Sequence, residues 1–93
     1  MKFPFKDSEN LGVLTCSHIL EKKYDICYVT HDEDDSGWQF LCNKHDHTDS
    51  DVRIVSLKNI FEFDSSIGIL TDMPLGCGAI IESKEYSWKG FRK

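Results

Sequence analysis

The sequence has no long apolar run, few prolines and no segment rich in linker residues. Its 93 residues include two prolines and six glycines, and neither these nor serine gather into a linker. No apolar run approaches the length of a membrane span, and the opening residues have no apolar segment of the kind that directs export. We therefore expect a single cytoplasmic domain with a modest core, without a membrane partner.

Basic residues are almost missing from the middle of the chain. Residues 25–51 contain eight acids and one base, Lys44, whereas residues 84–93 are basic, and the net charge is −5. A field of this kind repels nucleic acid and steers a basic protein toward the acidic part of the chain. The simpler interpretation is that acidic loops keep a small protein in solution.

The acidic run falls between two strand-like segments, 25–31 and 38–43, and predicts a hairpin. A two-residue turn at Ser36-Gly37 would bury carboxylates against the core, at a high cost in free energy. A six-residue loop over 32–37 leaves the acids in solvent instead. It also sets His31 opposite Trp38, Val29 opposite Phe40 and Cys27 opposite Cys42, and it is the register that we expect.

The rest of the chain supplies shorter elements around this hairpin. Ser17 is expected to cap a brief helix and Ser56 to cap the best helix of the chain, 57–63, in which apolar residues recur at helical spacing. Residues 44–51 contain no apolar side chain and predict a surface loop. Further strands are expected at 11–16, 52–55 and 75–82. The fold class predicted is a small α+β domain with an antiparallel sheet of about four to five strands, one main helix and one short helix.

Several short motifs together resemble a bacterial family. They are Ser17-x-Ile19-Leu20, Asp35-Ser36-Gly37-Trp38-x-Phe40, Leu57-x-x-Ile60-x-x-x-Asp64-x-x-Ile67 and Pro74-x-Gly76. In this order and spacing the chain is similar to the Imm33-like family, formerly a domain of unknown function. It departs from the pattern at His18, where a lysine is expected, and at Ser65, where a proline is expected.

The resemblance implies a small α+β immunity protein that binds a bacterial toxin and has no catalytic role. The domain would cover residues 11–83, with 1–10 as a lead-in segment and 84–93 as a basic C-terminal tail. The family brings no catalytic residue, metal or cofactor with it.

Two metal motifs are incomplete. Asp32-x-Asp34-x-Ser36-Gly37 matches the opening of an EF-hand loop, but position twelve is Asn43 instead of the glutamate that would supply two ligand oxygens. Zinc could be held by Cys42, His45 and His47 with Cys27 from the facing strand, yet the spacing matches no common zinc motif. Surface histidines and buried thiols are the better interpretation.

The sequence offers little for catalysis. Cys16-Ser17-His18 places a nucleophile and a base in a contiguous run, which seldom provides the geometry that nucleophilic catalysis needs. The chain has no P-loop and no glycine-rich phosphate cradle. All four cysteines are expected to be reduced thiols, because a chain without an export signal remains in a reducing compartment.

We thus expect an immunity protein that neutralises a cognate toxin through an acidic surface. The toxin would have a basic surface and could be a nuclease. The predicted partner-binding residues are Asp32, Glu33, Asp34 and Asp35, with Asp46, Asp49 and Asp51 as a second patch. The alternatives are a regulatory interaction module with another partner and a small metal-dependent enzyme.

Overall fold

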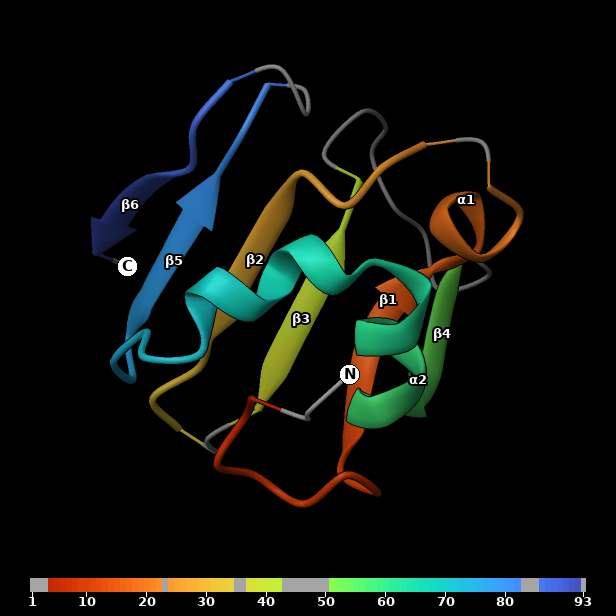
Figure 1. Cartoon of the computed structure of the whole chain (residues 1–93), viewed down its shortest axis with the longest axis horizontal. Coiled ribbons are helices and arrows are strands. Elements are labelled where there is room, and N and C mark those ends of the chain that lie inside the picture. The colour runs from red at the N-terminus through yellow and green to blue at the C-terminus, as the bar shows by residue number, and fades with distance from the viewer. Residues whose placement is uncertain (1–3, 23, 35–36, 43–50, 83–85, 93) are drawn as a thin grey trace.

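The structure is a computed structural model, and it describes residues 4–22, 24–34, 37–42, 51–82 and 86–92. Six strands form one mixed sheet in the order β4-β1-β3-β2-β5-β6 (Figure 1). The strands are β1 (Gly12–Cys16), β2 (Tyr28–His31), β3 (Trp38–Leu41), β4 (Val52–Ser56), β5 (Cys77–Ile80) and β6 (Lys89–Arg92).

The helical elements are α1 (Ser17–Leu20), α2 (Leu57–Phe63) and the 3-10 helix η1 (Ser65–Leu70). In Figure 1, α2 and the turquoise η1 lie across one face of the sheet. As expected, Ser56 caps α2, where its hydroxyl accepts from the backbone N–H of Asn59. The predicted cap at Ser17 was wrong: Ser17 is the first helical residue of α1, and its N–H donates to the carbonyl of Asp51.

The small α+β class is confirmed, but the predicted sheet was wrong in strand number and partly in direction. The described residues form six strands instead of four to five, and β1 pairs in parallel with β3. The parallel pair arises because the second strand of the β2–β3 hairpin, and not the first, lies beside β1. The sixth strand comes from the expected basic tail, where Phe91 is the only large apolar residue of β6 and gives a weak strand signal.

Phe91 explains one glycine of β5. Its ring lies over Gly78, where an added Cβ would overlap the ring, and it also packs on Tyr28 with the ring centroids 5.8 Å apart. Glycine at position 78 therefore leaves room for the ring of Phe91 and for the backbone carbonyl oxygen of Val29.

The hairpin register is confirmed where the strands pair. His31 lies opposite Trp38 and Val29 opposite Phe40. Both strands are shorter than expected, and the paired ladder ends at Tyr28 and Leu41. Beyond it, the N–H of Cys27 donates to the carbonyl of Leu41.

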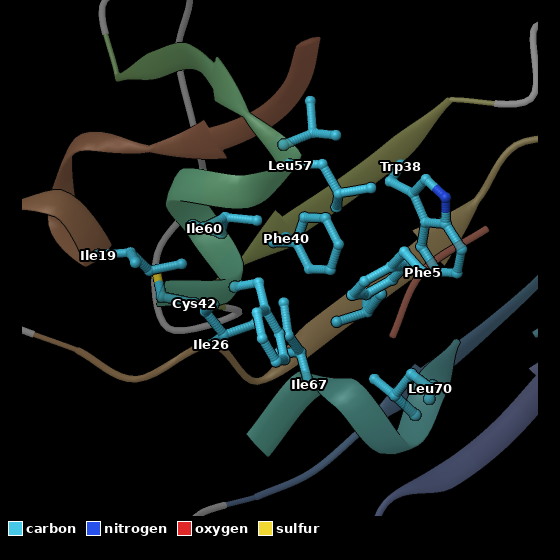
Figure 2. Packing of buried hydrophobic residues seen from close by; sticks show 14 of the residues in the cluster. Phe5, Ile19, Ile26, Trp38, Phe40, Cys42, Leu57, Ile60, Ile67 and Leu70 are labelled. Carbon is cyan, nitrogen blue, oxygen red and sulfur yellow. The ribbon is translucent and has the colours of Figure 1, made fainter. Parts of the chain in front are cut away.

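The core lies between the sheet and α2–η1, and the N-terminal segment contributes to it. Phe5 is only 6% exposed and makes edge-on contacts with Trp38, Phe40 and Phe61. Figure 2 shows the ring of Phe5 beside Trp38. Phe5 and β6 flank the range 11–83 expected for the domain, and both pack against it.

Within the described ranges, no helix is long and apolar enough to cross a membrane.

Candidate functional site

The described acids of the hairpin loop, Asp32, Glu33 and Asp34, form what we call the acidic tip. Glu33 and Asp34 are exposed, whereas Asp32 is half-buried. The N–H of Asp32 donates to the carbonyl of Gly37 at 2.8 Å, which closes the loop, and the carboxylate of Asp32 accepts from the side-chain amide of Gln39 at 2.9 Å. Two exposed carboxylates are therefore held at the end of a hydrogen-bonded hairpin.

A neighbouring turn supports the tip from one side. Gly76 has a φ of +79°, and its N–H donates to the carbonyl of His31 at 2.8 Å. A Cβ at Gly76 would stand 3.0 Å from a carboxylate oxygen of Glu33. Glycine is favoured here by the left-handed backbone, and a Cβ would also displace the exposed carboxylate of Glu33 slightly.

Aromatic packing supports the tip from behind. Trp38 is 2% exposed and stacks on His31 with the ring centroids 4.0 Å apart. Its indole N–H donates to the carboxylate of Asp7 at 3.0 Å, and the Nδ1 of His31 lies 2.9 Å from the carbonyl oxygen of Met73. The residues at the base of the loop are thus fixed by packing and by hydrogen bonds.

Asp51, the one described residue of the second predicted acidic patch, lies away from the acidic tip. The expectation that all four loop acids lie in solvent was wrong for Asp32, because Gln39 draws its carboxylate against the sheet. Asp35, Asp46 and Asp49 lie outside the described residues, as does Ser36 of the family motif. Asp51 directly precedes Val52, the first residue of β4. Val52 pairs with Cys16, which ends β1 on the side of the sheet farther from the tip, so that Asp51 lies at that far end.

The other motif residues have structural roles. Phe40, Leu57 and Ile60 are fully buried in the core. Asp64 caps η1, since its carboxylate accepts from the N–H of Ser66 at 3.1 Å. Pro74 is exposed in the turn before Gly76.

An apolar groove of about 530 Å³ begins beside the acidic tip. It runs between η1 and the β5–β6 pair, and Met73 and Cys77 line it near the tip. Its walls include Ile69, Trp88 and Phe91. The groove thus places apolar surface beside the turn at Gly76 that contacts Glu33.

No sequence motif indicated that His18 lies near the buried thiols of Cys16 and Cys42. Among the described residues, one group of three side chains has its ligand atoms within 4.8 Å of one another, and it consists of Cys16, His18 and Cys42. Cys27, expected to join Cys42 in a zinc site, is not part of the group, and His45 and His47 lie outside the described residues. The only sequence signal for this group was that Cys16 and His18 are two residues apart at the end of a predicted strand.

Comparison of the chain with protein-family models, with curated proteins and with solved structures returned no match. The similarity to the Imm33-like family therefore stays a prediction from the motifs.

Proposed function

We propose that this chain is an immunity protein that neutralises a toxin by protein–protein contact, with the acidic tip as the main contact. The observation that supports this most directly is the exposure of Glu33 and Asp34 on a hairpin that is held from both sides. The Imm33-like motifs support the toxin as the class of partner.

The rigid support of the tip favours tight binding. Carboxylates that follow a hydrogen-bonded strand end lose less conformational entropy on binding than carboxylates on an unrestrained segment. They also steer a basic partner during encounter, since complementary charge raises the association rate. The proposal needs no catalytic step, metal or cofactor in the immunity protein.

The charge of the tip also suggests how inhibition would work. A toxin that cleaves nucleic acid presents a basic cleft to phosphate, and Glu33 and Asp34 would compete with phosphate for it. The same charge disfavours direct binding of nucleic acid to the tip. The adjacent groove would accept an apolar side chain of the toxin, in keeping with interfaces that combine a buried apolar centre and a polar rim.

A cell-survival assay tests this function. The product of the neighbouring gene, where the proposal expects a toxin, is expressed together with the wild-type chain or with the double variant Glu33→Gln/Asp34→Asn. The matched control is Asp25→Asn/Glu62→Gln, which removes the same charge at two other exposed positions. Wild type and control should protect the cells, and the tip variant should protect them poorly.

Circular dichroism of each purified variant establishes that it is folded. A folded tip variant that protects as well as wild type would exclude the acidic tip as the main contact. A wild-type chain that gives no protection would contradict the immunity function and favour a regulatory module with another partner.

A further inference from the structure

Three elements bring Cys16, His18 and Cys42 together at the end of the sheet farther from the acidic tip. We call these side chains the thiol–imidazole cluster. Cys16 is the last residue of β1, and Cys42 directly follows β3. Because β1 and β3 run parallel, the carboxyl ends of both strands lie at the same end of the sheet. α1 begins immediately after β1 and adds His18.

The geometry of the cluster is close to that of a metal site. The two sulfur atoms and a ring nitrogen lie within 4.8 Å of one another, and the Nδ1 of His18 is 3.9 Å from the sulfur of Cys42. Tetrahedral zinc, with Zn–S near 2.3 Å and Zn–N near 2.0 Å, sets neighbouring sulfur atoms about 3.8 Å apart and sulfur and nitrogen about 3.5 Å apart. The distances between the ligand atoms would therefore have to shorten by about 1.3 Å or less to reach zinc-binding geometry.

We propose that the thiol–imidazole cluster binds one zinc ion through the two sulfurs and the imidazole of His18, with water as the fourth ligand. Thiolate and imidazole are the ligands that zinc prefers over the oxygen ligands of calcium and magnesium. Zinc binding would release the thiol protons of Cys16 and Cys42, and the cation would stabilise both thiolates.

The surroundings of the cluster suit this role. Cys16 and Cys42 are both 0% exposed, whereas His18 is half-buried, so that water can reach the cluster from the histidine side. The ring of His18 meets Tyr24 edge-on, with the centroids 6.1 Å apart, which limits its rotation. The imidazole of His18 thus lies on the solvent side of two buried sulfurs and contacts that of Cys42.

Metal titration of the reduced full-length chain tests the proposal. Zinc is added in competition with a chromophoric chelator, and Co²⁺ is added separately as a spectroscopic probe. We expect one bound ion per chain and an absorption band from cobalt–thiolate charge transfer. His18→Ala should weaken zinc binding by more than about 100-fold, because loss of a direct ligand should exceed the 10- to 100-fold effect of losing an outer-shell partner.

The control is Cys77→Ser, which removes a thiol outside the cluster and should leave both the affinity and the cobalt band unchanged. Since His18 is half-buried, His18→Ala should retain the fold, which circular dichroism would establish. Cys42→Ala serves as a second ligand variant with the same expected loss.

Three results would overturn the proposal. The first is that the reduced wild-type chain binds no stoichiometric zinc. The second is that folded His18→Ala binds zinc as tightly as wild type does. The third is that Cys77→Ser loses zinc binding while the variants of the cluster keep it. Survival of cells exposed to the toxin is a separate readout that addresses only the acidic tip.

Discussion

Replacement of Phe5 by alanine tests whether the N-terminal segment is part of the fold. Phe5 is 6% exposed and touches three aromatic rings, with centroid separations of 5.3 Å to Trp38, 6.3 Å to Phe61 and 6.4 Å to Phe40. Removal of a buried phenylalanine typically costs about 3–5 kcal/mol, in part because a cavity remains. We expect Phe5→Ala to lower the free energy of unfolding by about 3–4 kcal/mol.

Urea denaturation followed by tryptophan fluorescence measures this loss. With an m-value near 2 kcal/mol/M, the midpoint should fall by about 2 M. The matched control is Phe63→Ala, since Phe63 is 40% exposed at the end of α2 and should cost less than about 1 kcal/mol. Equal midpoints for the two variants would refute the packing of the N-terminal segment in the core.

Three further changes address the supports of the tip and the buried thiol. Gly76→Ala should destabilise the fold by about 1–2 kcal/mol in thermal unfolding, because the φ of Gly76 is +79°. The control is Gly90→Ala, which should change stability by less than about 0.5 kcal/mol, because an added Cβ would lie 3.8 Å from its nearest neighbour, the carbonyl oxygen of Gly78. Asp7→Ala leaves the buried indole N–H of Trp38 without its carboxylate and should cost about 1–3 kcal/mol in urea denaturation; a loss below about 0.3 kcal/mol would contradict this bond. Burial raises the pKa of the Cys16 thiol above its ordinary value of 9.0, so the folded state retains this proton at higher pH than the unfolded state does. This difference in proton binding contributes to the free energy of unfolding, and the contribution is fully present below pH 9.0 and is lost as the pH rises through the folded pKa. Melting temperatures of the metal-free protein, measured from pH 7 to 10, should therefore fall less steeply with pH for Cys16→Ala than for wild type.

Local patterns in the sequence were sufficient to predict the elements with strong periodicity. Helix α2 has the predicted limits because a capping serine and a helical run of apolar residues define both its start and its face. The hairpin register followed from the cost of burying carboxylates, and the observed pairs agree with it.

Long-range features were harder to predict. The parallel pairing of β1 with β3 depends on where the hairpin inserts in the sheet, and no local pattern specifies that position. Phe5 is isolated in a polar segment, so its burial among other aromatic rings was not evident from periodicity. The meeting of Cys16 with Cys42 follows from the same parallel pair and was missed for the same reason.

Direct measurement of toxin affinity is the sharpest test of the acidic tip as a binding surface. Calorimetric titration of the purified toxin should show binding to wild type that weakens with added salt, and binding to Glu33→Gln/Asp34→Asn that is at least about tenfold weaker and less dependent on salt. The Asp25→Asn/Glu62→Gln control should bind as wild type does. An unchanged affinity and an unchanged salt dependence in the folded tip variant would contradict the account.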